Sequence, residues 1–119
     1  FINFGNALFR FHWLGESAAV FEELIKNQPR NPYGYQGAAY AYAAMNDPAT
    51  QEVAAKNFEK AIELGFRTFN NYFTLGIINA NLGNFFKARE NIKRALEINP
   101  DSQNARQVLE TINRSLLLN

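Results

Sequence analysis

The sequence predicts an all-α fold in which antiparallel helix pairs stack into a right-handed superhelix, an α-solenoid of seven helices. Three observations predict it. Apolar residues recur at helical spacing, short breaks of Gly, Pro and Asn separate the helical stretches, and the pattern returns after 34 residues. Ala88 and Ile92, for example, correspond to Ala54 and Phe58. Because such helix pairs bury their apolar sides only against neighbouring pairs, this period indicates a stacked array.

The first helix is expected over residues 1–11, and the second from about Trp13 to the residue before Pro29. In both, apolar and small residues follow one another at the spacing of a single helical face. The expected buried stripes are Phe1, Phe4, Gly5 and Leu8 in the first helix and Leu14, Ser17, Phe21, Leu24 and Ile25 in the second.

Asn31-Pro32 marks the start of the third helix, since Asn is a preferred N-cap and Pro fits the first turn. This helix is expected over residues 33–45 and the fourth from Pro48 to about residue 64, with Gly65 as a left-handed cap. The repeat is 37 residues long here, and an added first turn at residues 48–50 would leave the register intact. The expected stripes are Tyr35, Ala38, Ala39 and Tyr42, then Val53, Ala54, Phe58, Ala61 and Ile62.

The fifth helix is expected over residues 69–82, closed by Gly83, and the sixth over residues 85–98. Of the pair Phe85-Phe86, one ring is expected to fill the gap between helices and the other to be exposed. The seventh helix begins near Ser102 and has one apolar and one polar side, as a terminal cap requires. The expected stripes are Tyr72, Leu75, Gly76 and Asn79 in the fifth helix and Ala105, Val108, Leu109, Ile112 and Leu116 in the seventh.

The third copy of the repeat reads Tyr72-x2-Leu75-Gly76-x2-Asn79, then Ala88-x3-Ile92, then Pro100. This pattern resembles the tetratricopeptide repeat, which has W-x2-L-G-x2-Y, A-x3-F and P on a 34-residue period. The resemblance implies one domain with repeats at about 1–31, 32–68 and 69–102 and a capping helix at about 102–117. Since the chain opens at Phe1, partway into the first repeat, we expect it to be part of a longer protein.

The composition restricts the possible functions. The net charge of +1 gives no basic field for nucleic acid, and the absence of cysteine excludes disulfides and thiolate chemistry. No apolar run approaches the roughly 18 residues of a membrane span. The compartment is not fixed by these features, and the cytoplasm is the default assumption.

No enzymatic site is expected. His12, the only histidine, corresponds to Asn46 and Gly83 at a turn, and the interpretation as a turn residue is favoured. The carboxylates stand beside Lys and Arg at i,i+3 and i,i+4 spacing, which is typical of a solvated helix surface. There is no phosphate-binding loop, metal-ligand cluster or nucleophile motif, so no cofactor and no catalytic residue is predicted.

The most informative surface is the free side of the first helix of each repeat, which in tetratricopeptide arrays lines a concave groove. Aromatic, apolar and amide side chains gather there, and exposed aromatic patches among polar groups are typical of binding sites. Amides can pair with a peptide main chain, and Tyr and Phe add contact area. The predicted peptide-binding residues are Asn6, Phe9, Arg10, Tyr33, Gln36, Tyr40, Asn70, Phe73, Ile77 and Asn81.

These residues favour a protein-interaction module with a scaffold or adaptor role, whose partner is a protein or peptide. The carboxylate clamp with which some members of the family bind acidic tails is matched only by Asn6. The alternative is a self-associating array, a homo-oligomer joined through the chain ends, because Leu116, Leu117 and Leu118 cannot all face inward on one helix.

Overall fold

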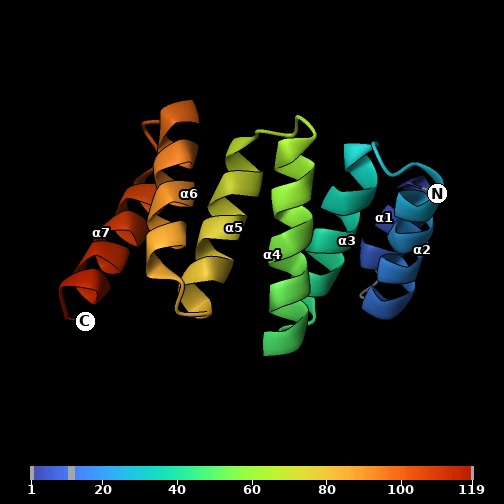
Figure 1. Ribbon diagram of the computed structural model, residues 1–119, viewed down its shortest axis with the longest axis horizontal. Coiled ribbons are helices and arrows are strands. Elements are labelled where there is room, and N and C mark those ends of the chain that lie inside the picture. The colour runs from blue at the N-terminus through green and yellow to red at the C-terminus, as the bar shows by residue number, and fades with distance from the viewer. Residues whose placement is uncertain (1, 11–12, 119) are drawn as a thin grey trace. The chain divides into compact units, whose positions relative to one another are not determined.

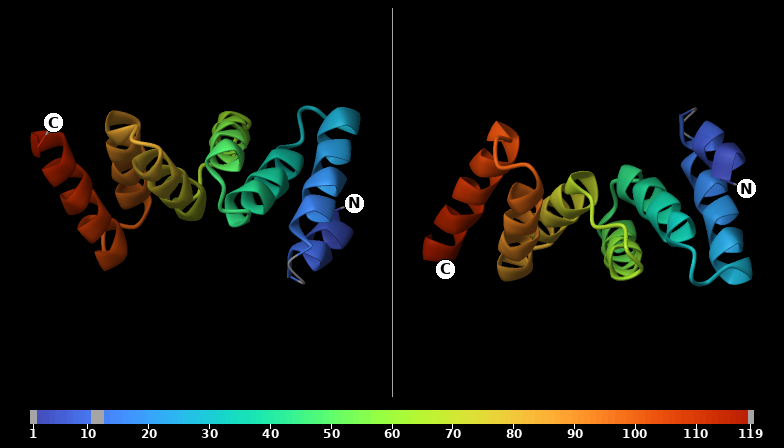
Figure 2. Two further views of the ribbon diagram at one scale, coloured as in Figure 1. Left: turned by 90° about the horizontal axis from the view of Figure 1, so that it is seen from below. Right: turned by 90° about the horizontal axis from the view of Figure 1, so that it is seen from above.

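The computed structural model describes residues 2–10 and 13–118, with the backbone alone for Ile2. Within these ranges the chain forms seven α-helices and no β-strand, which confirms the predicted all-α class (Figure 1). Within residues 2–66, and again within residues 67–118, successive helices run in alternating directions (Figure 2). The helices are α1 (Ile2–Arg10), α2 (Leu14–Asn27), α3 (Pro32–Ala44), α4 (Pro48–Glu63), α5 (Phe69–Asn81), α6 (Phe85–Ile98) and α7 (Gln103–Leu118).

Side-chain caps fix the starts of four helices, and at α7 the Ser102 hydroxyl accepts a hydrogen bond from the Ala105 amide. The Asn31 side chain accepts a hydrogen bond from the Tyr33 amide, and the Thr68 hydroxyl accepts one from the Asn71 amide. At α4 the Asp47 carboxylate accepts from the Ala49 amide at 2.8 Å, while the Asp47 amide donates back to the Thr50 hydroxyl. These bonds satisfy backbone N–H groups that have no partner inside the helix.

The helices end where a left-handed residue was expected. Asn46 has φ 57°, Gly65 has φ 116° and Gly83 has φ 83°. Asn tolerates this backbone region better than most residues, and Gly adopts it without steric cost. His12, the turn residue predicted for the first repeat, lies outside the described residues.

The chain divides into two compact units, residues 1–66 with α1 to α4 and residues 67–119 with α5 to α7. In the first unit α2 packs on α1 and α3, and α3 packs on α4. Phe21, Leu24 and Ala38 form one cluster of its core. The Ser17 hydroxyl, where the later repeats have Ala, donates to the Gly5 carbonyl oxygen at 2.9 Å and is therefore satisfied in a buried position.

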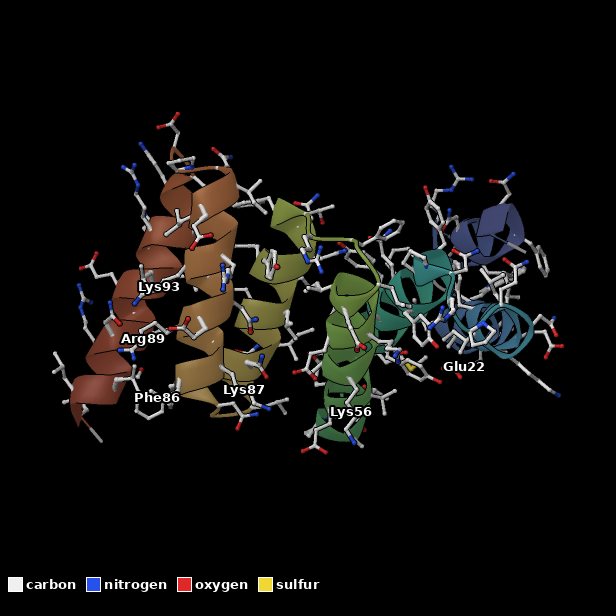
Figure 3. All side chains as sticks on the ribbon, turned by 45° about the horizontal axis from the view of Figure 1, so that its top comes forward. Glu22, Lys56, Phe86, Lys87, Arg89 and Lys93 are labelled. Carbon is white, nitrogen blue, oxygen red and sulfur yellow. The ribbon has the colours of Figure 1, made fainter. Side chains whose placement is uncertain are left out.

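In the second unit α6 packs between α5 and α7. Its core contains Ala88, Ile92, Ala105 and Ile112, with Phe85 packed against it. Phe86 is 68% exposed and lies beside Arg89, whose guanidinium carbon is 5.4 Å from the ring centroid (Figure 3). The prediction that one of the two phenylalanine rings packs between helices and the other is exposed is confirmed.

The three extra residues of the middle repeat form one additional helical turn. Helix α4 has 16 residues, whereas its counterparts α2 and α6 have 14 each. The register of the 34-residue period places the start of α6 opposite residue 51, so the added turn is residues 48–50, as predicted. Ala54, Phe58 and Ala61 remain fully buried behind it.

Two residues that were expected in buried stripes are exposed. Phe4 is 62% exposed, because no described helix precedes α1 to cover it, whereas Ala38 at the same register packs on Phe21 and Leu24. Val53 is 39% exposed, and Ala55 is buried instead. The buried stripe of α4 thus runs along the side of the helix away from Val53. The expected single domain and the repeat boundaries stay predictions.

Candidate functional site

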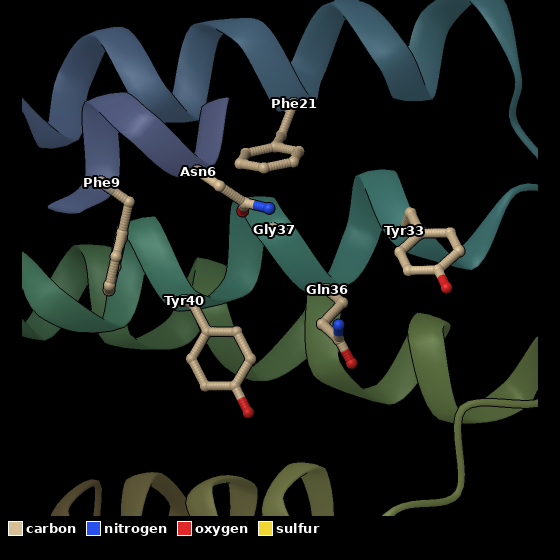
Figure 4. A pocket seen from close by; sticks show the side chains of 7 residues that line it. All are labelled: Asn6, Phe9, Phe21, Tyr33, Gln36, Gly37 and Tyr40. Carbon is tan, nitrogen blue, oxygen red and sulfur yellow. The ribbon is translucent and has the colours of Figure 1, made fainter. Parts of the chain in front are cut away.

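A pocket of about 390 Å³ opens between α1 and α3 in the first unit (Figure 4). Its wall on α1 consists of Asn6 and Phe9, one turn apart on the helix. Its other side comes from α3, where the side chains of Tyr33, Gln36 and Tyr40 surround Gly37. The complete lining is Asn6, Phe9, Phe21, Tyr33, Gln36, Gly37 and Tyr40.

The floor of this pocket depends on two glycines. The ring of Phe21 from α2 is only 2% exposed and lies between the backbones of α1 and α3. A β-carbon at Gly5 would be 2.6 Å from Cε2 of this ring, and one at Gly37 would be 2.2 Å from Cε1 on its other edge. Since real β-carbons do not approach this closely, only glycine fits at either place without a shift of the ring.

The two tyrosines at the pocket are held by other aromatic rings. Tyr40 meets Phe58 of α4 edge to face, with centroids 5.0 Å apart and an interplanar angle of 89°. Tyr33 meets Phe66 in the same way, at 4.8 Å and 85°. Such contacts stabilise by about 0.5–1.5 kcal/mol beyond burial, so both rings are positioned before any ligand arrives.

A second pocket, of about 460 Å³, lies in the second unit. Phe73, Ile77, Ala80 and Asn81 of α5 form one side of it. The Phe73 ring stacks on Phe69, with centroids 5.4 Å apart. The other side comes from α7 and consists of Asn104, Gln107, Val108 and Thr111.

Eight of the ten residues predicted for peptide binding line one of the two pockets. Asn6, Phe9, Tyr33, Gln36 and Tyr40 meet in the first, and three residues of α5 belong to the second. Arg10 and Asn70 line neither. Tyr72, expected in the core, and Phe73, expected in the groove, are both half-buried, and Phe73 alone lines a pocket.

The contribution of α7 was not predicted, because the sequence favours a terminal cap whose polar side, with Asn104 and Gln107, faces water. A signal for it exists in the period itself. Adding 34 to Asn70, Phe73 and Ile77 gives Asn104, Gln107 and Thr111, so α7 occupies the place of a further first helix of a repeat. Its inner face therefore lines a pocket in the same way as α5 does.

No charged side chain lines either pocket. The described ion pairs lie on exposed helix surfaces, as expected from the spacing, and join Lys60 to Glu63 at 3.5 Å, Arg94 to Glu97 at 3.4 Å, and Arg114 to Glu110. Pairs of this kind contribute about 0–1 kcal/mol and hold no site together. Among the described residues no group of His, Asp and Glu side chains could hold a metal ion, and no described helix is long and apolar enough to cross a membrane.

One titratable group with a shifted pKa lies in the first unit, away from the pocket lining. Burial raises the pKa of Tyr42 above 10.0, and the negative charge of Glu22 and the hydrogen bond to its carboxylate raise it further. The phenol therefore stays neutral and donates to Glu22. This contact joins α3 to α2, the helix that supplies the floor of the pocket.

The tetratricopeptide repeat family model matches residues 69–102. A comparison of the sequence with curated proteins finds no match. In all, 110 chains of solved structures match, and three of them show how far the likeness extends.

The first TPR of Spaghetti (RPAP3) bound to the HSP90 peptide SRMEEVD is 23% identical, with a TM-score of 0.86 over 97% of this chain and 89% of that one. The TPR protein YrrB, described as having an unusual peptide-binding site, is 24% identical with a TM-score of 0.87, over 98% of this chain and 59% of that one. The second TPR domain of human RPAP3 in complex with the HSP70 peptide SGPTIEEVD is 21% identical, with a TM-score of 0.82 over 93% of this chain and 90% of that one.

These likenesses agree with the paired helices described above. At such identities the solved structures establish the fold, while the family model establishes the repeat at residues 69–102. The chain therefore carries a tetratricopeptide repeat at residues 69–102 and has the all-α fold of such arrays over nearly its whole length.

Proposed function

We propose that this chain is a protein-interaction module that binds a peptide segment of a partner protein in the pocket between α1 and α3. One observation carries the proposal. Aromatic rings and two side-chain amides, all from the first unit, converge there on a hollow that is open to solvent. A mostly apolar hollow with a few convergent polar groups is the usual form of a ligand site.

Two considerations support this function. Structures with the same fold hold peptides, SRMEEVD in one and SGPTIEEVD in another. Tetratricopeptide repeats are in general interaction modules rather than enzymes, and the proposal contains no catalytic step. The pocket of the second unit, on α5 and α7, also combines apolar side chains with amides.

The test is selection from a display library of short random peptides. We expect wild-type protein to retain peptides that the double variant Phe9→Ala/Tyr40→Ala does not, because two of the pocket's rings are then missing. Loss of Tyr40 also removes the contact with Phe58. The variant Asn6→Arg, at an exposed position of the same pocket, therefore provides a second blocked protein whose folding is not at risk.

Phe86→Ala is the matched control, since it removes an aromatic ring that is 68% exposed and lines neither pocket. It should retain the wild-type set of peptides. If the wild type retains no peptide, or if both blocked variants retain the same ones, the pocket between α1 and α3 is not a peptide site.

A second candidate, self-association through the end of α7, has one observation in its favour. Leu117 and Leu118 are each 87% exposed, and burial of such side chains is favourable by about 1.5–3 kcal/mol each. Sedimentation at increasing concentration should then show a rise in mass that the variant Leu117→Ser/Leu118→Ser abolishes. A constant monomer mass for the wild type would exclude this candidate.

A further inference from the structure

We infer that the pocket between α1 and α3 selects an uncharged segment and takes up one aromatic side chain of it over Gly37. The inference rests on the proposed function and adds the chemistry of the ligand. Three features of the pocket support it, namely its floor, its size and its lack of charge.

The floor is a flat place on α3. Gly37 stands on the groove side of the helix, with Tyr33 four residues before it and Tyr40 three residues after it. The Phe21 ring fills the space that a side chain at Gly37 would need, so the Gly37 backbone and Phe21 form the floor between the two phenol rings. Figure 4 shows the two phenol rings on either side of Gly37, with the Phe21 ring between Gly37 and α2. A planar side chain fits such a floor better than a branched one, because its face can lie on the exposed backbone while its edges meet the flanking rings.

The size agrees with an aromatic side chain. An apolar cavity of roughly 150 Å³ is enough to admit a benzene ring. The pocket measures about 390 Å³ and therefore has space for one ring and for the neighbouring main chain of the segment that carries it. Asn6 offers an amide donor and an amide acceptor at this place, which suits a peptide main chain.

The absence of charge decides between classes of segment. A carboxylate or an ammonium that entered the pocket would lose water without gaining a counter-ion, since all the lining side chains are neutral. Arg10 follows Phe9 directly but does not line the pocket. The glutamates and aspartate of a peptide such as SRMEEVD would therefore find no cation here.

The selected peptides test this inference directly. We expect those lost in Phe9→Ala/Tyr40→Ala and Asn6→Arg to share a Phe, Tyr or Trp and to have no charged residue next to it. Raising the salt from about 0.1 M to about 1 M shortens the Debye length from about 10 Å to about 3 Å. Because no charge in the pocket is screened, we expect the Kd to change by less than about threefold over this range.

A charge added to the pocket sharpens the test. Gln36→Glu keeps the size of the side chain, and we expect it to weaken binding of the selected neutral peptides by roughly tenfold, because the new carboxylate must lose water against an apolar ligand. Asn113→Asp adds the same charge on an exposed position of α7 that lines neither pocket, and it should leave the Kd unchanged.

The outcomes separate the two levels of the proposal. Selected peptides that are acidic or basic and bind more weakly with salt, but are still lost in the blocked variants, would overturn the inference and leave the peptide site standing. Peptides retained equally by wild type and blocked variants would overturn both.

Discussion

The ring of Phe21 lies so close to the backbone of Gly37 that a β-carbon there would stand 2.2 Å from its Cε1 atom. The ring comes from the second helix of one repeat and the glycine from the first helix of the next. One contact therefore joins two repeats and forms the floor of the pocket.

We predict that Gly37→Ala destabilises the first unit by about 1–3 kcal/mol, because the added methyl group forces the ring out of a packed position. The measurement is urea unfolding followed by the fluorescence of Trp13, the only tryptophan, which belongs to this unit. Gly15→Ala is the matched control, since a β-carbon at Gly15 meets nothing within 4 Å. It should leave stability unchanged or raise it by up to about 1 kcal/mol. Equal stability of both variants would refute the close contact.

The capping box at the start of α4 predicts a difference between two caps. Asp47→Ala removes the side-chain acceptor for the Ala49 amide and should cost about 0.5–2 kcal/mol. Asn84 also precedes a helix, but its side chain makes no capping hydrogen bond. Asn84→Ala should thus cost less than Asp47→Ala in thermal unfolding, and the reverse order would contradict the assigned caps.

The amide of Asn79 donates to the Asn91 side-chain oxygen at 2.8 Å and joins α5 to α6 from a buried position. Asn91→Ala leaves the Asn79 amide without this partner, and we expect a loss of about 1–3 kcal/mol. In the double variant Asn79→Ala/Asn91→Ala the two losses should not add, with a coupling of at least about 0.5 kcal/mol. Strict additivity in denaturant unfolding would show that the bond does not contribute.

Tyr42 gives the first unit a dependence on alkaline pH. Its pKa in the folded protein is raised by burial and then by Glu22, so the folded state favours the neutral phenol. The resulting stability is fully present below pH 10.0, the ordinary value, and is lost as the pH rises through the folded pKa. Above pH 10.0 the unfolding midpoint of wild type should fall more steeply than that of Tyr42→Phe. Parallel curves would mean that Tyr42 is not shifted.

The period made most of the fold predictable. It places glycine, alanine and aromatic residues at recurring positions, and Phe21, Phe58 and Ile92 are all buried at the same position of successive repeats. The exceptions are positions where the sequence pattern is not enough. Phe4 shares the register of the buried Ala38, but burial depends on a covering helix and not on register alone. Val53 is apolar, yet it is exposed because its Cα–Cβ bond points away from the buried side of α4.

The sequence predicts which residues lie on the free faces of the helices, but it does not predict the shape of the pocket that they form. Spacing alone put Asn6, Phe9 and Tyr40 on free faces, and the structure brings them to one hollow. That the hollow lies over Gly37 follows only from the three-dimensional packing of Phe21. The 34-residue period also contains a signal for the α7 side of the second pocket. It did not lead to a prediction, because the polar residues Asn104 and Gln107 are equally typical of a helix in contact with water.

The extra turn of α4 at residues 48–50 has a consequence for how such proteins diverge and are recognised. A turn added at the start of a helix, before its buried residues, leaves the core unchanged. It offsets all later residues by three positions from the 34-residue period. The family model matches residues 69–102, the copy after the insertion, whereas likeness of fold extends over 97% of the chain in one solved structure. A whole turn inserted at this point thus lengthens the repeat while Ala54, Phe58 and Ala61 stay fully buried.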